Sequence, residues 1–388
     1  MKRIGIECEQ LEGKRFGVGH TLAQLLDAAT KVPDIEKNYR FVLYFKAEIP
    51  TDAFLSHPLF EKKILTGGII PRSFNVFYHI LIPIYSLVDH IDCFFFPSYM
   101  LPAFFVGKSV VVLTNDVYWE AHHGSLPLKY RLAYRIFCWW AAKRAQRIMT
   151  ISQFAGDELR GFYGIPEKRL VINPWGLEEC VAVLEKNDAY ARTLTDIKKR
   201  LGITEKFFIS VGQAFPRRHM KEAVEAFGTI ADKYPNIQYC VACFDKYDPP
   251  VLEKLYADIN ARAGRNAIIQ TSYIGRNELI YLMNDTLGMV YVSDKEALGL
   301  PPLETLACGR PSVIADTPLA HELFGDDGFF VKNTSDPASI AEQLIRIIEH
   351  RYDAERIVAL QRPHLARLSW SVHTTRLLVM FDDVIKKR

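Results

Sequence analysis

Two glutamates, Glu296 and Glu304, flank a loop that runs into a helix start marked by prolines. Proline is tolerated in the first turn of a helix, where the N–H groups have no partner within the helix. The same N–H groups and the helix dipole favour an anion, and Gly299 permits close approach of the backbone. Two carboxylates beside an anion site suit sugar and ribose hydroxyls better than phosphate. The segment therefore predicts a site that holds hydroxyl groups next to an anion.

A second motif supplies positive charge. Gly212 ends an apolar run, and Arg217 and Arg218 follow it just before a helical pattern. Two fixed cations at a helix start suit a pyrophosphate, because they neutralise the charge that grows when a bond to it breaks. A solvated basic turn is the alternative interpretation of this segment.

A third motif is a glycine-rich turn with Gly17 and Gly19, which follows the first apolar run of the chain. Such turns between strand and helix occur in many Rossmann-like domains, so this signal alone is weak. The turn lacks the full GxGxxG spacing, which disfavours a dinucleotide site.

Short strand-like runs alternate with helical patterns along the whole chain. We expect a first series of strands at residues 3–7, 41–45, 92–96, 109–114, 147–151 and 169–172, and a second series at 207–211, 238–243, 267–274, 287–292 and 311–315. This alternation is typical of parallel sheets covered by helices on both faces. A polar stretch at 178–204 separates the two series.

The fold class that follows is α/β, with two Rossmann-like doubly wound domains facing a central cleft. We expect an N-terminal domain at 1–185 and a C-terminal domain at 200–369, with a final amphipathic helix at 370–388. Ligands of such sheets bind beyond the carboxyl ends of the strands, where the motifs above lie.

The composition fits a folded protein of 388 residues with a net charge of +3 and seven cysteines. An odd number of scattered cysteines and the lack of an apolar signal core lead us to expect a reduced, cytoplasmic setting. No apolar run reaches the roughly 20 residues of a spanning helix. The mildly basic charge gives no support to a nucleic-acid partner.

Residues 293–311 resemble the E-x7-E signature of retaining GT-B glycosyltransferases, in particular glycosyltransferase family 4. Members typically read E-G-F-G-L-P-x-x-E-A-M-A-x-G-x-P, and this chain reads E-A-L-G-L-P-P-L-E-T-L-A-C-G-R-P from position 296. The resemblance implies that Glu296 holds hydroxyls of a donor sugar and that Glu304 holds the ribose diol. Backbone amides of Leu298, Gly299 and Leu300 would reach the sugar and phosphate. The chain departs from the pattern at Ala297 and Leu298.

The resemblance extends to the basic motif, where members read V-G-x-x-x-P-R-K-N. Arg217 matches the arginine, Arg218 stands where lysine is common, and His219 replaces asparagine. Gly212 is the glycine of this motif. The Gly17–Gly19 turn is similar to a loop that closes over the donor phosphate.

Three further segments resemble the family. Asn115 stands where members have a histidine that contacts the transferred sugar, and the nearby His122 and His123 are alternatives for that role. Residues 273–279, which include Ile274, resemble a stretch whose backbone receives the nucleobase. The segment from Ser369 resembles the start of a closing helix that packs back on the N-terminal domain.

The resemblance implies transfer of a hexose from a nucleoside diphosphate sugar to an acceptor hydroxyl, with retention of configuration, no cofactor and no metal at the phosphates. GDP-mannose is slightly favoured as donor, because P-R-R-H is closest to the mannosyltransferase-like P-R-K-N; UDP-glucose and UDP-N-acetylhexosamines stay open. We expect a sugar, polysaccharide precursor or lipid-linked acceptor. A non-catalytic nucleotide-sugar-binding protein and a sugar-nucleotide epimerase are the alternatives.

Residues 121–156 contain no aspartate or glutamate but many basic and aromatic residues. A helix of this kind suits contact with an anionic membrane surface, and a buried helix with basic ends is the alternative. We therefore expect peripheral membrane contact through 128–147, at the inner face of the membrane.

Overall fold

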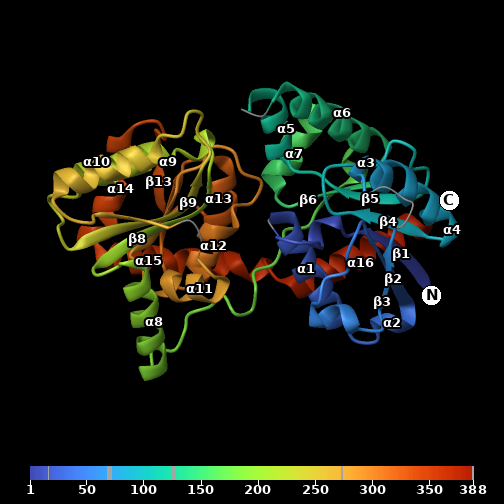
Figure 1. Cartoon of the computed structure of the whole chain (residues 1–388), viewed down its shortest axis with the longest axis horizontal. Helices are drawn as coiled ribbons and strands as arrows, with labels where there is room; N and C mark the ends of the chain where they lie inside the picture. The colour runs from blue at the N-terminus through green and yellow to red at the C-terminus, as the bar shows by residue number, and fades with distance from the viewer. Residues whose placement is uncertain (16, 68–71, 125–126, 272–273, 387–388) are drawn as a thin grey trace. The chain divides into compact units, whose positions relative to one another are not determined.

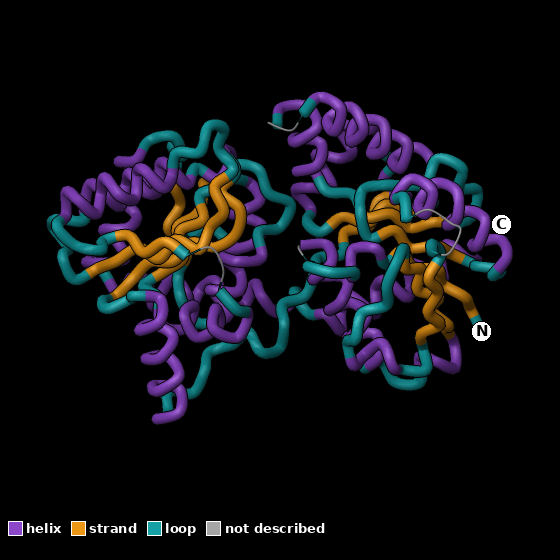
Figure 2. The backbone as a smooth tube through the Cα atoms, in the orientation of Figure 1, coloured by secondary structure: helices purple, strands orange, loops and turns teal. Residues whose placement is uncertain are grey.

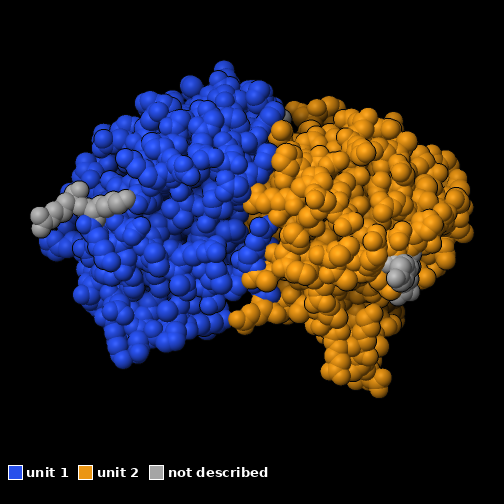
Figure 3. Space-filling view, turned by 180° about the vertical axis from the view of Figure 1, so that it is seen from behind, with its two compact units in different colours: residues 1–178, 367–388 blue, residues 179–366 orange. Residues whose placement is uncertain are grey.

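The computed structural model describes residues 1–15, 17–67, 72–124, 127–271 and 274–386. The chain forms two compact units, residues 1–178 with 367–388 (unit 1) and residues 179–366 (unit 2), which are coloured separately in Figure 3. The division falls inside the polar stretch at 178–204. Residues 179–185, which the sequence assigned to the first domain, belong to unit 2.

Unit 1 contains a seven-stranded sheet in which all pairs are parallel, in the order β3-β2-β1-β4-β5-β6-β7 (Figures 1 and 2). Its strands are β1 (Lys2–Glu7), β2 (Tyr39–Phe45), β3 (Phe60–Ile64), β4 (Cys93–Phe96), β5 (Ser109–Val112), β6 (Arg147–Thr150) and β7 (Leu170–Ile172). Its helices are α1 (Gly17–Thr30), α2 (Ile35–Asn38), α3 (Phe74–Val76), the π-helical turn η3 (Phe77–Leu81), α4 (Ile82–Val88), α5 (Asn115–His123), α6 (Leu128–Arg144), α7 (Gln153–Tyr163) and α16 (Trp370–Lys386). Short 3-10 turns are η1 (Glu9–Leu11), η2 (Ala53–Ser56) and η4 (Glu167–Arg169).

Both faces of this sheet are buried. Successive side chains of a strand point to opposite faces, so Phe95 packs with α1 and α16 on one face. Phe94 and Phe96 pack with α4, α6 and α7 on the other face. Strands buried on both sides read as continuous apolar runs, which is why the sequence located most of them.

Two segments almost 200 residues apart hold helix α16 within unit 1. The amide of Asn173 donates to the carbonyl of His373 at 3.1 Å, and the His373 ring contacts the carbonyl of Pro174 at 2.9 Å. Burial lowers the pKa of His373 to about 4, so the neutral ring donates its Nδ1 hydrogen to that carbonyl. A Cβ at Gly176 would lie 2.2 Å from the Trp370 nitrogen, so only glycine allows this approach.

Unit 2 repeats the architecture with a six-stranded parallel sheet, in the order β10-β9-β8-β11-β12-β13. Its strands are β8 (Lys206–Ala214), β9 (Ile237–Asp245), β10 (Ile268–Gln270), β11 (Gly288–Tyr291), β12 (Ser312–Ala315) and β13 (Phe329–Val331). Its helices are α8 (Asp188–Leu201), the short η5 (Pro216–Arg218), α9 (Met220–Ile230), α10 (Leu252–Ala263), α11 (Arg276–Asp285), α12 (Leu300–Ala307), α13 (Pro318–Phe324), α14 (Pro337–Glu349) and α15 (Arg351–Gln361). The turn η6 (Arg362–Arg367) follows α15.

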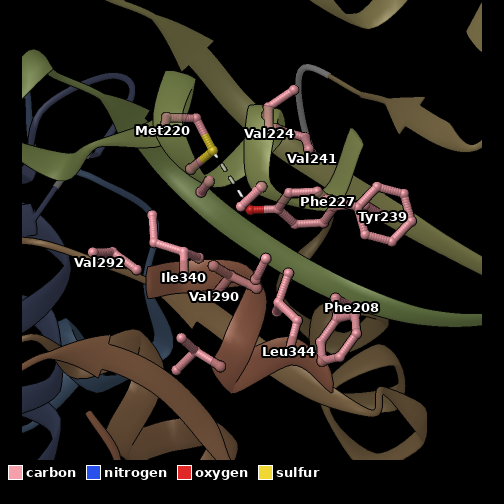
Figure 4. Packing of buried hydrophobic residues seen from close by; sticks show 14 of the residues in the cluster. Phe208, Met220, Val224, Phe227, Tyr239, Val241, Val290, Val292, Ile340 and Leu344 are labelled. Carbon is pink, nitrogen blue, oxygen red and sulfur yellow. Dashed lines mark hydrogen bonds between the residues drawn. The ribbon is translucent and has the colours of Figure 1, made fainter. Parts of the chain in front are cut away.

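One face of this second sheet packs against α9, α10 and α14, and Figure 4 shows residues of α9 and α14 in this packing. Phe208, Tyr239 and Val290 from the strands meet Phe227 and Leu344 from the helices. The hydroxyl of Tyr239 is satisfied within this apolar core by Ser210 at 2.7 Å. This packing fixes the strands whose carboxyl ends carry the sequence motifs.

The sequence analysis missed β3 and β13, each of which is one of the two edge strands of its sheet; it located the other two edge strands, β7 and β10. β3 reads Phe-Glu-Lys-Lys-Ile, with only its first side chain buried. An edge strand has one partner and one solvated side, so charged residues are tolerated there. No strand-like apolar run then marks it.

Among the described residues, no helix combines the length and the apolar character that a membrane crossing requires.

The packing of α16 gives a first prediction. Phe381 is fully buried and makes edge contacts with Phe41 and Phe95 at 6.4 and 5.9 Å. Phe381→Ala should lower the free energy of unfolding of unit 1 by about 3–5 kcal/mol. Urea unfolding followed by tryptophan fluorescence reports this unit alone, because all five tryptophans lie in it.

Val379, on the same helix but 60% exposed, provides the control. Val379→Ala should change the free energy by no more than about 0.5 kcal/mol. Equal effects of the two substitutions would contradict this role of α16.

Candidate functional site

The two strongest motifs meet at the carboxyl ends of the strands of the unit 2 sheet. β8 lies between β9 and β11, so the chain leaves β8 toward one side and later returns on the other side. Such a switch point is where doubly wound sheets bind ligands, beyond the carboxyl ends of the strands. Arg217 and Arg218 follow β8, and Glu296 follows β11.

Arg218 and Glu296 form an ion pair across this switch point. Nε of Arg218 donates to Oε1 of Glu296 at 2.8 Å, and the side chains are 20% and 13% exposed. Ser293 donates its hydroxyl to the same Oε1 at 3.0 Å. The Arg218 guanidinium lies over the Tyr291 ring, 5.2 Å from its centroid.

The pKa of Arg218 is raised, so its guanidinium stays protonated. Burial acts to lower this pKa, but Tyr291 and Glu296 more than compensate. Nη1 also donates to the carbonyl of Gln213 at 3.1 Å. These contacts fix the guanidinium and leave Nη2 with no recorded partner among the described residues.

Glycine and histidine conformations shape the loop that carries the arginines. Gly212 has φ +112°, and a Cβ there would lie 3.3 Å from Nη1 of Arg218. His219 adopts the left-handed conformation, with φ +45°. Asparagine and histidine enter this region more readily than most residues, so His219 suits the position where the family resemblance has asparagine.

The two loops are also joined through their backbones. The Asp294 amide donates to the Arg217 carbonyl at 3.2 Å, and Nε of Arg217 donates to the Lys295 carbonyl at 3.3 Å. The His219 ring contacts the Asp294 carboxylate at 2.5 Å. Arg217, Arg218 and Glu296 are therefore held in place before any ligand binds.

The loop before α12 fits the residues that depart from the family pattern. Among the described residues, the non-glycine positions with positive φ are Asp34, His90 and His219, so Ala297 needs no glycine. Gly299 has φ +77° and caps α12. Pro301 and Pro302 have no N–H, so the amides of Leu298, Gly299 and Leu300 are the candidates for an anion.

Glu304 has a partner that the sequence analysis did not name. Arg276 binds it with both ends of its fork, at 2.6 Å (Nη2 to Oε1) and 3.0 Å (Nη1 to Oε2). Glu304 is buried, in the middle of α12. Arg276 is the first residue of α11 and directly follows Gly275. It lies in the segment that resembles the nucleobase-binding stretch, and this position is the only sign in the sequence that Arg276 belongs to the site.

Ile274 precedes this pair in the chain. Its side chain is buried, so only its backbone is available to a ligand, as the resemblance implies. Leu298 is buried too. Tyr273, which belongs to the same resemblance, lies outside the described residues.

The two glycines of the predicted phosphate loop, Gly17 and Gly19, lie in α1 of unit 1. A Cβ at Gly19 would lie 2.1 Å from the Gln10 carbonyl oxygen, so this glycine serves close packing of α1 on the preceding loop. Gly17 is exposed and has open space around it. Gly19 is not in the left-handed conformation.

Asn115 is fully buried at the start of α5. Its amide donates to Oε2 of Glu158 at 2.7 Å, which joins α5 to α7. Contact with a sugar would require this side chain to leave that position, so its catalytic role stays a prediction. His122, the alternative, stacks on Tyr118 and bonds the Tyr118 carbonyl at 2.8 Å.

Two cavities lie at opposite ends of the strands of the unit 2 sheet. One of about 30 Å³ lies beside Tyr291, Glu296 and Gly299, well below the about 300–1,000 Å³ of typical small-molecule pockets. The other, of about 570 Å³, lies at the amino ends of the strands beside Lys206 and Pro311. The larger cavity is lined by none of the predicted site residues, whereas Glu296 and Gly299 line the smaller cavity.

Groups of three or more His, Cys, Asp or Glu side chains suited to hold a metal ion are absent from the described part of the chain. Cys240 and Cys243 are both buried in β9. Burial raises the pKa of both thiols to about 12.

Most of unit 2 matches a known protein family. Residues 194–361 match the family described as "Glycosyl transferases group 1". The matched segment includes Arg217, Arg218, Arg276, Glu296 and Glu304. Most of unit 2 is therefore similar to a group 1 glycosyltransferase domain.

Two bacterial proteins illustrate the similarity. The chain is 24% identical over 231 residues to the serotype-specific mannosyltransferase WbdA of Escherichia coli, which covers 59% of this chain and 28% of WbdA. It is 22% identical over 226 residues to the O-antigen chain mannosyltransferase RfbU of Salmonella typhimurium, which covers 58% of this chain and 57% of RfbU. The match therefore spans only part of each relative.

Solved structures resemble the whole chain. Sucrose-phosphate synthase from Thermosynechococcus elongatus superposes with a TM-score of 0.74 and 14% identity, over 99% of both chains. HepE of Anabaena, crystallised with UDP-glucose, gives 0.70 and 15%, over 99% of this chain and 100% of HepE. The likeness, together with two parallel-sheet Rossmann-like units, confirms the predicted GT-B fold class.

The contact between His219 and Asp294 gives a prediction on pH. Burial acts to lower the pKa of His219, but the hydrogen bond and charge of Asp294, with Glu222, raise it overall. A raised folded-state pKa stabilises the fold below the unfolded value of about 6.5, and the contribution is lost as pH rises through the folded pKa. His219→Asn should therefore lower the free energy of unfolding by about 1–3 kcal/mol near pH 6 and by less near pH 9.

Urea unfolding followed by circular dichroism at the two pH values measures this difference. His350→Asn, at an exposed histidine of the same unit, is the control and should show little effect at either pH. A loss for His219→Asn that does not change with pH would show that the imidazolium is not involved.

Proposed function

We propose that this chain transfers a hexose, with mannose favoured, from a nucleoside diphosphate sugar to an acceptor hydroxyl. The observation that carries the proposal is the Arg218–Glu296 pair at the switch point of β8 and β11. It brings a cation suited to a diphosphate into contact with a carboxylate suited to sugar hydroxyls. The similarity to WbdA and RfbU, both described as mannosyltransferases, supports the choice of sugar.

The proposed reaction proceeds with retention and without a metal, as the family resemblance implies. Arg217 and Arg218 stabilise the diphosphate as the bond between C1 and the phosphate oxygen breaks. The acceptor oxygen forms its bond to C1 on the same face, and its proton passes to the departing phosphate oxygen. Glu296 orients the sugar through its hydroxyls.

GDP-mannose is the favoured donor, and a UDP-sugar is the alternative. The solved complex of HepE with UDP-glucose supports the alternative for this fold. The proposed acceptor is a polysaccharide precursor or a lipid-linked sugar, reached at the inner face of the membrane. The name of a further relative, the alpha-monoglucosyldiacylglycerol synthase of Streptococcus pneumoniae, supports a lipid acceptor.

Calorimetry with GDP-mannose and UDP-glucose, followed by a turnover assay, tests this function. The double substitution Arg217→Ala with Arg218→Ala should weaken donor binding by about 10²- to 10⁴-fold, because two charge-assisted hydrogen-bonding groups are lost. Glu296→Gln should retain much of the binding and lose turnover. Arg192→Ala, at an exposed position of α8, is the control and should bind as the unaltered protein does.

The outcome also separates the alternatives. Donor binding with no hydrolysis or transfer would identify a non-catalytic binding protein. Formation of an epimeric nucleotide sugar without an acceptor would identify an epimerase. Unchanged affinity after removal of both arginines would overturn the assigned donor site.

The Arg276–Glu304 pair gives a prediction on ribose recognition. If Glu304 accepts the ribose hydroxyls, the protein should bind a nucleoside diphosphate about tenfold more tightly than its 2′-deoxy form, the equivalent of one hydrogen bond to a charged group. Arg276→Ala should remove this preference, because Glu304 loses the fork that fixes it. Arg276→Lys keeps the charge but not the two parallel bonds, and it should restore only part of the preference.

Calorimetry with the two nucleotides measures the preference, and thermal unfolding shows whether each variant is folded. A folded Arg276→Ala variant that still discriminates against the 2′-deoxy nucleotide would assign the pair a structural role only.

A further inference from the structure

Helix α6 carries an exposed apolar stripe. Leu128, Leu132, Ile136 and Trp139 are spaced by four, four and three residues, which places them on one face of the helix. Each is more than half exposed, from 52% at Trp139 to 74% at Leu128. The other side of α6 is buried against the sheet. The stripe therefore covers nothing within unit 1.

A second exposed apolar stripe follows η3 and α4. Ile80, Ile84, Leu87 and Val88 share one helical face, and the last two are 61% and 62% exposed. Nearby, the loop after β4 exposes Phe104 by 69% and Val106 by 73%. Monomeric soluble proteins rarely expose large contiguous apolar patches, so such a patch marks an interaction site.

The three segments lie together on one face of the unit 1 sheet. The His79 ring of η3 stacks on Phe137 of α6 with centroids 5.2 Å apart, and its Nδ1 accepts from the Ala103 amide at 3.2 Å. Tyr99 contacts Tyr134 of α6 at 4.7 Å. The exposed residues at 80–88, 104–106 and 128–139 thus belong to one region, named here the apolar surface (α4 and α6 in Figure 1).

The segments that form the apolar surface carry charges of one sign. Residues 74–88, 97–107 and 121–156 contain no aspartate or glutamate. Lys129 lies over the Tyr130 ring and Arg144 over the Trp140 ring, at 4.8 and 5.4 Å. Long basic side chains with aromatic neighbours are suited to the boundary between apolar and charged groups of a lipid surface.

Other cations of α6 have a different task from the one expected from the sequence. Arg131 and Arg135 donate to the carbonyls of Ala121 and His122 at the end of α5. Arg147 is buried at the start of β6. The apolar stripe, more than the row of cations, is therefore what α6 offers to a partner.

We propose that the apolar surface docks unit 1 on the interface of a membrane that contains anionic lipids. A bilayer offers both an apolar layer for the exposed side chains and negative headgroups for the cations beside them. A second copy of the chain offers no acidic complement, because a two-fold contact through this region would bring like charges together. The proposal adds a partner to the proposed function and does not depend on which sugar is transferred.

Sedimentation with vesicles tests the docking directly. The chain should bind vesicles of phosphatidylethanolamine and phosphatidylglycerol, and it should bind phosphatidylcholine vesicles more weakly. Leu132→Ser with Ile136→Ser, and separately Leu87→Ser with Phe104→Ser, should each reduce the partition coefficient by about tenfold, because two side chains no longer enter the apolar layer. Val379→Ser with Leu360→Ser removes exposed apolar side chains outside the apolar surface and should leave vesicle binding unchanged.

Urea unfolding followed by tryptophan fluorescence, which reports unit 1, shows that the same variants are folded. Vesicle binding needs no donor, so the outcome of this test is separate from that of the proposed function. Vesicle binding by both double variants at the level of the unaltered chain would overturn the proposal. So would failure of the unaltered chain to bind anionic vesicles. A dimer in analytical ultracentrifugation that both variants disrupt, without vesicle binding by the unaltered chain, would assign the surface to a second copy.

Discussion

The candidate site of unit 2 depends on one ion pair, between Arg218 and Glu296. Both side chains are largely withdrawn from water, and removing one partner of such a pair leaves a charge that the protein must stabilise alone. The surrounding residues fit around this pair. Gly212 lets the guanidinium approach the backbone, Tyr291 lies beneath it, and Ser293 donates to the carboxylate. The loops after β8 and β11 are therefore fixed relative to each other by the groups that would bind the donor.

Arg276 and Glu304 form a second ion pair of the same kind, between α11 and α12. In both pairs, an arginine neutralises a carboxylate that would otherwise repel a diphosphate. Each pair is neutral overall, and Arg217 adds a positive charge beside the first pair. Electrostatic groups fixed before a ligand arrives reduce the cost of ordering the site on binding.

The two faces of the unit 1 sheet are covered in different ways. One face is closed by α1 and α16, with α16 held by Asn173, Pro174 and Gly176. The other face is covered by α4, α6 and α7, and the outer sides of α4 and α6 carry the apolar surface. The same helices thus close the core and expose a region that no part of unit 1 covers.

The sequence by itself determined the architecture and predicted the type of chemistry. Buried parallel strands are apolar throughout, and the helices between them have their own period. Local patterns therefore located all strands except β3 and β13, one edge strand of each sheet. The glycines, arginines and glutamates of the two main motifs lie close in sequence to the strand ends that position them. Their chemistry could therefore be argued from residue type and spacing.

The tertiary structure alone decided which of these residues meet. Arg218 and Glu296 are 78 residues apart, and Arg276 and Glu304 are 28 apart, on separate elements. It also buried Asn115 against Glu158 and used Arg131 and Arg135 to cap α5. Residue type gives a side chain its charge and size, but its partner and its exposure depend on contacts between distant segments, which no local pattern encodes.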